Sequence, residues 1–189
     1  MALAPVDSPP RPEPRVSLRP ASPRDADLLR RWRAEPSVRR YQPLNDLTTA
    51  QLRSDVAGQR MGDLHKSRGE KFQWIIQVDG DPAGWLTLVV SNWEHGLAEV
   101  GYALSSAFQS RGVMSRALTL LLTELFAHTT LERIEARCAV GNSASQRLLE
   151  KAGFTREGRL RAYFRLRGRR VDNLLYAILR SDFYGRQVE

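Results

Sequence analysis

The change of hydrophobic period between residues 99 and 126 constrains the fold more than any other feature of this sequence. From Glu99 to Leu104, larger apolar residues alternate with small or charged ones, which is typical of a strand. After a short polar connection the period becomes that of an amphipathic helix, whose apolar positions are Met114, Leu118, Leu121, Leu122 and Leu125. The chain must therefore turn sharply from a strand into a helix near residue 110.

That turn is rich in hydrogen-bond donors, namely Gln109, Ser110, Arg111, Gly112 and Ser115. The first N–H groups of a helix have no intrahelical partner, and the helix dipole favours negative charge there. Gly112 would let the backbone approach a phosphate closely. We interpret the turn as a pyrophosphate cradle, although an ordinary strand–turn–helix connection has the same local pattern. The G-x-G-x-x-G and P-loop signatures do not occur in it, which disfavours nicotinamide and ATP as ligands.

The remaining periodicities predict an α+β fold with the element order β-α-α-β-β-β-α-β-α-β-β. Residues 1–14 are predicted to be a disordered proline-rich tail, and residues 15–185 a single domain. The elements that we expect besides the central strand and helix are a strand at 16–19, helices starting near Ser22 and Thr48, a hairpin over 71–90, a strand at 133–140, a helix at 142–151 and a hairpin over 154–179.

The charge balance is basic, with a formal net charge of +8. Residues 156–170 contain seven arginines and a single acidic residue, Glu157. Such a segment favours an anionic partner: cofactor phosphates, RNA or an acidic protein. No apolar run approaches the ~20 residues of a membrane span. The lone cysteine, Cys138, favours a reducing cytoplasm, and the histidine spacing predicts no metal site.

Two motifs resemble those of the GNAT acetyltransferase superfamily, and specifically of its RimJ/RimL-type branch. The first, [RQ]-x-x-G-x-[GA], is matched by residues 109–114, except that Met114 replaces the final small residue, as that branch tolerates. The second, N-x-x-S-x-x-x-x-E-K-x-G-F, is matched by residues 142–154. The closing hairpin of the branch is also matched, at Glu157, Gly158, Arg161, Gly168, Asp172 and Tyr176. The resemblance covers residues 15–183.

The resemblance implies a seven-stranded, mostly antiparallel sheet that splays between its fourth and fifth strands, with acetyl-CoA bound at the splay. The fourth strand would pair with pantetheine as if with another strand. The residues that the resemblance places on acetyl-CoA are Tyr102, Ala103 and Leu104 on the strand, Gln109, Ser110, Arg111, Gly112, Val113, Met114 and Ser115 at the pyrophosphate, Asn142 and Ser145 near the pantetheine arm, and Arg147 or Lys151 near the outer phosphates.

The resemblance also suggests the catalytic residues. Ser145 would protonate the departing thiolate of CoA, although a serine in a first helical turn can simply bond the backbone. Phe164 stands where the branch has a glutamate base. We therefore expect Glu99 to act as the general base, with Asp172 as the second candidate. An α-amine with a pKa near 8 is already partly neutral at pH 7, so a water relay would also suffice.

We therefore expect an acetyl-CoA-dependent N-acetyltransferase in which the amine attacks the thioester directly in a ternary complex. The expected acetyl acceptor is a protein N-terminus, with a ribosomal protein as one candidate. One alternative is a small amine such as an antibiotic, a polyamine or an amino-acid derivative. The other is an RNA-binding module, because residues 161–167 interleave aromatic and cationic side chains and could contact RNA or the ribosome. We expect a cytoplasmic monomer or homodimer.

Overall fold

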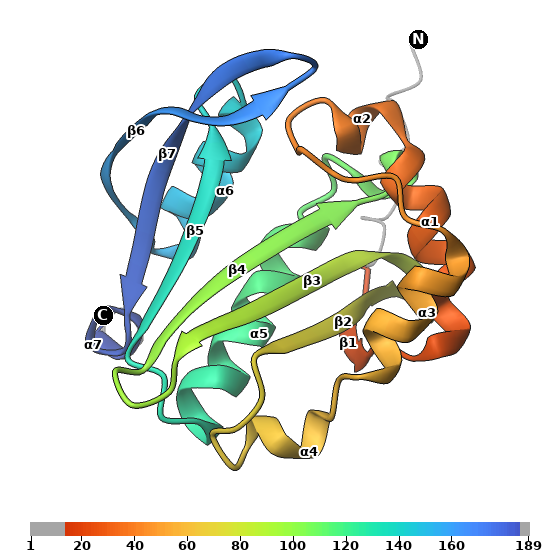
Figure 1. Ribbon diagram of the computed structural model, residues 1–189. Helices are drawn as coiled ribbons and strands as arrows, with labels where there is room; N and C mark the ends of the chain where they lie inside the picture. The colour runs from red at the N-terminus through yellow and green to blue at the C-terminus, as the bar shows by residue number, and fades with distance from the viewer. Residues whose placement is uncertain (1–13, 186–189) are drawn as a thin grey trace, which may run out of the picture.

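The computed structural model describes residues 14–185 of the 189-residue chain. The predicted proline-rich tail therefore lies almost entirely outside the described residues. The helices and strands, shown in Figure 1, are β1 (Val16–Pro20), α1 (Ala26–Ala34), α2 (Pro36–Arg39), α3 (Thr49–Ala57), α4 (Met61–Leu64), β2 (Lys71–Val78), β3 (Asp81–Asn92), β4 (Leu97–Leu104), α5 (Val113–His128), β5 (Arg133–Ala139), α6 (Ser143–Ala152), β6 (Thr155–Leu166), β7 (Arg169–Leu179) and α7 (Arg180–Gly185).

The strands form one seven-stranded sheet in the order β1-β2-β3-β4-β5-β7-β6. Only the β4/β5 pair is parallel, so the predicted mixed, mostly antiparallel α+β sheet is confirmed. The predicted element order lacks α2, α4 and α7. Each of these helices has six residues or fewer, which is too short for a helical period to show in the sequence.

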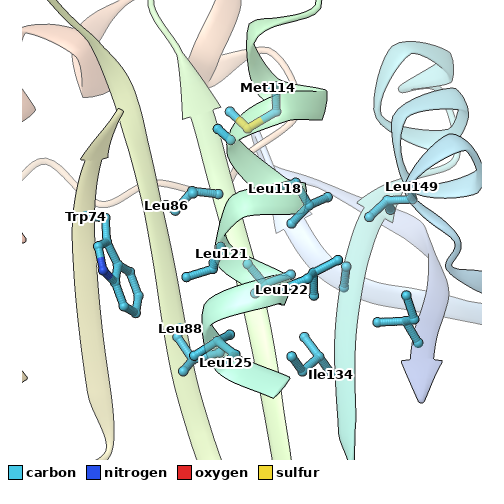
Figure 2. Close-up of a cluster of buried hydrophobic side chains, with 14 of the residues drawn as sticks. Trp74, Leu86, Leu88, Met114, Leu118, Leu121, Leu122, Leu125, Ile134 and Leu149 are labelled. Atoms are coloured by element: carbon cyan, nitrogen blue, oxygen red, sulfur yellow. The ribbon is translucent and has the colours of Figure 1, made fainter. Parts of the chain in front are cut away.

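Alternation along the strands gives the sheet two apolar faces, each covered by helices. The face that carries Trp74, Leu86 and Leu88 packs on α5, whose buried leucines fill the main core (Figure 2). We call it the α5 face. The opposite face, which we call the α1 face, carries Ile75 and Trp85, and these pack with α1 and α3. The sheet therefore separates α5 on one side from α1–α3 on the other, as Figure 1 shows.

Strands β4 and β5 pair only at their beginnings. Their register runs from Leu97 opposite Arg133 to Glu99 opposite Glu135, and the strands then diverge into a V (Figure 1). The rest of β5 stays paired on its other side with β7, as far as Ala139 opposite Asn173. The predicted splay between the fourth and fifth strands is therefore present, and it leaves one edge of β4 open.

The β6–β7 hairpin contains an irregularity that aims its tip toward the V. The register shifts between Leu160 and Phe164, and Ala162 has a φ of 50°. The Asp172 carboxylate holds this distortion, since it accepts hydrogen bonds of 2.7 Å from both the Ala162 N–H and the Arg159 Nε. The distortion matters because Tyr163 and Phe164, the next two residues, line the opening between the diverging strands.

Candidate active site

A cavity of about 980 Å³ occupies the space where β4 and β5 diverge. Because it passes between the strands, it has residues of both faces in its wall. We call the part built by the start of α5 and by α6 the α5 half. We call the part built by α1, the α2–α3 loop, β2, β3 and the β6–β7 hairpin the α1 half.

The α5 half centres on the uncapped N-terminus of a 16-residue helix. Gly112 precedes the helix with a φ of 72°, and no side chain caps it. A Cβ placed on Gly112 would meet no atom within 4 Å, so the space in front of the helix is open. The Nε2 of Gln109 donates to the Leu104 carbonyl at 3.0 Å and so fastens the turn to the end of β4. Unpaired N–H groups, a helix dipole and open space suit a pyrophosphate.

The free edge of β4 suits the extended arm of the same ligand. The Ser105 N–H bonds the Ala83 carbonyl of the preceding hairpin, so the alternate residues Tyr102 and Leu104 turn their backbone groups away from β3. Consistent with this, the carbonyls of Tyr102 and Leu104 receive side-chain amides, from Gln42 at 2.8 Å and from Gln109 at 3.0 Å. The backbone of these two residues is thus presented to the V, where a chain with amide groups can pair with it.

Ser145 lies deep in the cavity between two other hydrogen-bonding side chains. It is only 8% exposed, and its Oγ is 2.8 Å from the Tyr102 Oη. Burial raises the pKa of Tyr102 above its ordinary value, although the hydrogen bond with Ser145 opposes the shift. The phenol therefore keeps its proton near neutral pH, and either hydroxyl of the pair can donate to the other.

Cys138 lies in the same cavity wall as Ser145. Its thiol is buried, and burial raises its pKa. A thiol is a nucleophile as its thiolate, so this environment keeps Cys138 unreactive.

Glu99 reaches the cavity from the α1 face, opposite to Tyr102. Its Oε2 lies 2.5 Å from the Nη1 of Arg137, which also bonds Glu135 at 3.2 Å and lies over the Tyr163 ring at 5.4 Å. Burial raises the pKa of Glu99, and the charge of Glu135 adds to this, while Arg137 opposes it. A carboxylate with a raised pKa is a stronger base near neutral pH.

Neither Phe164 nor Asp172 places a second carboxylate in the cavity. The Phe164 ring lines the wall, half-buried and edge-on to Tyr163 at 6.1 Å. Asp172 is not among the lining residues, and its two oxygens hold Ala162 and Arg159. These hydrogen bonds lower the pKa of Asp172. Its visible role is to brace the hairpin.

The cavity brings together most of the residues that the sequence assigns to cofactor binding. Arg111 and Lys151 do not line it; the Arg111 guanidinium instead lies 5.8 Å from the Phe108 ring. Asn142 lines it and also caps α6, because its Oδ1 accepts the Ser145 N–H at 3.2 Å. The predicted residues in the wall are Glu99, Tyr102, Ala103, Leu104, Gln109, Ser110, Gly112, Val113, Met114, Ser115, Asn142, Ser145 and Arg147.

Sequence reasoning missed several polar residues of the wall, of which three are instructive. Gln42 holds the α2–α3 loop against β4, and Arg33 contributes a cation from α1. Asn173 is 4% exposed, and its Oδ1 has no hydrogen-bond partner within the described part of the chain. No local sequence pattern identifies these three as site residues. Gln109, in contrast, could be identified because it belongs to a motif.

No metal site competes with this interpretation in the described residues. Between residues 14 and 185, no three His, Cys, Asp or Glu side chains are grouped so that they could hold an ion. None of the described helices is long and apolar enough to cross a membrane.

A model of the acetyltransferase (GNAT) domain matches residues 15–155, which hold β1 to α6 and the whole cavity wall except the part from the β6–β7 hairpin. The chain belongs to the GNAT acetyltransferase family. Its homologues are named N-acetyltransferases, and the enzyme class follows from them.

Relatives within the family differ in their named substrates. The uncharacterized N-acetyltransferase p20 of Bacillus licheniformis is 29% identical over 172 residues, covering 90% of this chain and 96% of its own. The spermidine N(1)-acetyltransferase of Escherichia coli (strain K12) is 27% identical, covering 84% of this chain and 77% of its own.

Two solved structures share the fold and bind CoA. RimL, the ribosomal L7/L12 alpha-N-protein acetyltransferase, in complex with CoA, has a TM-score of 0.77 at 25% identity, covering 87% of this chain and 93% of RimL. Mycobacterium smegmatis RimJ, in complex with a CoA disulfide, has a TM-score of 0.77 at 28% identity, covering 92% of this chain and 88% of RimJ. CoA in both complexes agrees with the ligand that the α5 half suits.

Proposed function

We propose that this GNAT N-acetyltransferase acetylates protein N-terminal α-amines, using acetyl-CoA as co-substrate, by direct attack of the amine in a ternary complex. One observation carries the proposal. The V between β4 and β5 joins Ser145 and Tyr102, from the α5 face, with Glu99, from the α1 face, in a single cavity. A thioester and an amine that enter from opposite faces would meet between them.

The residues of the α5 half and of the free β4 edge would bind acetyl-CoA. Val113, Met114 and Ser115 would bind the pyrophosphate through their N–H groups, Tyr102 and Leu104 would pair with the pantetheine amides, and Arg147 would lie near the outer phosphates. Acetyl-CoA supplies the activated acetyl group as a thioester. A β4 N–H at the V would stabilise the oxyanion that forms when the amine adds.

Two proton transfers complete the reaction. As the C–N bond forms, Glu99 takes a proton from the amine, directly or through water, and later releases it to solvent. As the C–S bond breaks, Ser145 donates its proton to the thiolate and recovers one from Tyr102, at the observed 2.8 Å. Tyr102 is then reprotonated from solvent.

A protein N-terminus fits the cavity better than a small amine for two reasons. RimL, the neighbour at 25% identity, is named for the α-amine of a ribosomal protein. A second hollow, between the α2–α3 loop and the hairpin tip, also adjoins the α1 half and shares Gln42, Pro43 and Leu44 with its wall. A small amine would leave this hollow empty, whereas a peptide would extend along it. We place the reaction in the cytoplasm, where ribosomal proteins are available.

The RNA-binding alternative is weakened because both of its aromatics, Tyr163 and Phe164, lie in the cavity wall. Phe164 lines the wall, and Tyr163, though 44% exposed, is covered on one face by Arg137. The arginines of the hairpin remain available to a ribosomal surface, so a docking contact is compatible with the enzyme.

The test uses labelled acetyl-CoA with three substrates: a peptide with a free N-terminus and no lysine, the same peptide N-terminally blocked and carrying one lysine, and spermidine. We expect label on the free N-terminus, and at least a hundredfold less with Ser145→Ala. Label confined to lysine or to spermidine would refute the α-amine proposal. The small-amine alternative would then take its place.

A further inference from the structure

Arg33 is a half-buried guanidinium in the α1 half that forms no ion pair within the described residues. It lines the cavity, and its Nη2 donates to the Asn45 carbonyl at 3.2 Å. Between residues 14 and 185 no Asp or Glu lies within ion-pair distance of it. Burial lowers its pKa, which is the cost of holding a cation without a close counter-charge. A guanidinium has five N–H donors, so most of its capacity is unused.

Arg40, whose side chain is exposed, adds a second unpaired cation to the same wall. Its guanidinium lies over the Tyr41 ring at 5.2 Å, and within the described chain it forms no ion pair. The carboxylates that could neutralise this half are already engaged. Asp55 is 2.6 Å from Lys71, and Glu99 is held by Arg137. The wall therefore carries two surplus positive charges facing the place where the amine substrate must lie.

The excess of positive charge continues in the second hollow, between the α2–α3 loop and the hairpin tip. The second hollow is lined by Arg165 and Arg167 of the hairpin tip, and by Arg39 from α2. Arg39 is paired with Asp46 at 2.9 Å, but Arg165 and Arg167 form no ion pair in the part of the chain that the structure describes. The hairpin tip thus brings two unpaired arginines to this hollow, while the α2 corner brings Arg39, which is paired. Figure 1 shows the β6–β7 tip and the α2 corner facing each other across the mouth of the V.

The corner that carries these arginines is fixed relative to the acetyl-transfer centre. Glu35, between α1 and α2, accepts hydrogen bonds of 2.8 Å from the Ser105 Oγ and from the Ser106 N–H, just after β4. Gln42 bonds the Tyr102 carbonyl at 2.8 Å. Arg33 and Arg40 therefore sit at defined places along the path, as residues that read a substrate must.

We propose that the amine substrate is an acidic N-terminal segment, whose Asp or Glu side chains within the first few residues bind Arg33 and Arg40, and whose following residues run past Arg165 and Arg167. This inference rests on the proposed function and names the substrate class within it. Guanidinium groups bind carboxylates in bidentate, charge-assisted pairs. The same surplus repels a polycation such as spermidine, since like charges brought together select against a partner.

The test compares three peptides with the same free N-terminal residue, followed by two glutamates, two glutamines or two lysines. We expect kcat/KM to be at least tenfold higher for the glutamate peptide than for the glutamine peptide, and lowest for the lysine peptide. The difference should lie in KM and should shrink as salt rises through the range that screens surface charges. Arg33→Gln with Arg40→Gln should bring the three peptides within about threefold of one another.

Arg31 provides the matched control, because it is an exposed arginine on the same helix that does not line the cavity. Arg31→Gln should leave the order and the ratios unchanged. Arg40→Glu should shift the preference toward the lysine peptide, a gain that loss of folding cannot imitate. Equal acetylation of all three peptides by the unmodified protein would overturn this inference while leaving the proposed function intact. Acetylation of no free N-terminus would refute the proposed function itself.

A short single-stranded RNA, added as a competitor, tests whether the arginines of the wall bind RNA and not an acidic peptide. If RNA inhibits acetylation of the glutamine peptide, and Arg33→Gln with Arg40→Gln relieves the inhibition, the arginines of the wall form an RNA site and the acidic-peptide proposal is wrong. If RNA inhibits no peptide, the arginines are reserved for the peptide substrate, as we propose.

Discussion

The two halves of the cavity are built in different ways. The α5 half comes from two short segments, residues 109–115 and 142–148, each a turn running into a helix. The α1 half draws on residues 37–38 and 40–44, around α2 and the loop that follows it, and on further residues from α1, α3, β2, β3, β4, β5 and the β6–β7 hairpin. A ligand that a whole family shares can be bound by short contiguous motifs. A substrate that differs between relatives is bound by side chains from many elements, which can change one at a time.

The largest effect should come from Gly112→Asp, which changes only the α5 half of the cavity. The substitution sets a carboxylate against the expected pyrophosphate, so we expect binding of CoA to weaken by more than a hundredfold in calorimetry. Gly112→Ala is the control. It adds the same strain at a φ of 72° and meets no atom within 4 Å, but it carries no charge. Equal loss in both variants would mean that backbone strain, and not charge, decides binding.

The next largest effect should come from Ser145→Ala, which removes the proposed proton donor to the CoA thiolate. Loss of a general acid typically lowers turnover by about 10²–10⁴-fold, and the affinity for CoA should stay within about threefold. Tyr102→Phe should have a smaller effect in the same direction, since Ser145 would lose its own donor. Ser143→Ala is the matched control, because that serine is exposed at the start of the same helix. A turnover loss of less than about threefold would leave Ser145 as a helix serine.

The same contrast explains what the sequence could predict. Gly112, Gln109 and Asn142 were identified because a turn before a helix is a local event, and its residues stand together in the chain. The splay and the position of β4 followed from element order and family resemblance. The α1 half could not be predicted in the same way. Gln42 meets Tyr102 across 60 positions, and Glu99 meets Arg137 across 38, and neither contact has a signature at either end.

Glu99→Gln is the corresponding change in the α1 half, and its effect should depend on pH. Burial raises the pKa of Glu99, so the carboxylate becomes an effective base only as pH rises through that raised value, and kcat/KM of the unmodified protein should climb along this limb. In the variant we expect about a tenfold loss at neutral pH and no such limb. The second limb, from the amine itself near pH 8, should remain.

Glu135→Gln is the control for this experiment. Glu135 bonds the same Arg137 but does not line the cavity. Because its charge helps to raise the pKa of Glu99, Glu135→Gln should keep the pH limb and move it to lower pH. An unchanged rate and pH profile in Glu99→Gln would assign proton removal to water. Asp172 would be a poor substitute, since Ala162 and Arg159 hold its carboxylate and lower its pKa.

The smallest effect distinguishes two cations on α6 that the sequence left as alternatives for the outer phosphates. Arg147 lines the cavity, whereas Lys151, one turn further along, does not. An exposed charge contact is worth roughly 0.2–1 kcal/mol, so Arg147→Ala should weaken CoA binding by about two- to fivefold, and Lys151→Ala by less than that. Both effects should fade at high salt. If the contact is to the ribose phosphate, dephospho-CoA should bind Arg147→Ala and the unmodified protein equally well. A larger loss from Lys151→Ala than from Arg147→Ala would show that the cofactor lies further along α6 than the cavity suggests, and the boundary between the two halves would have to move with it.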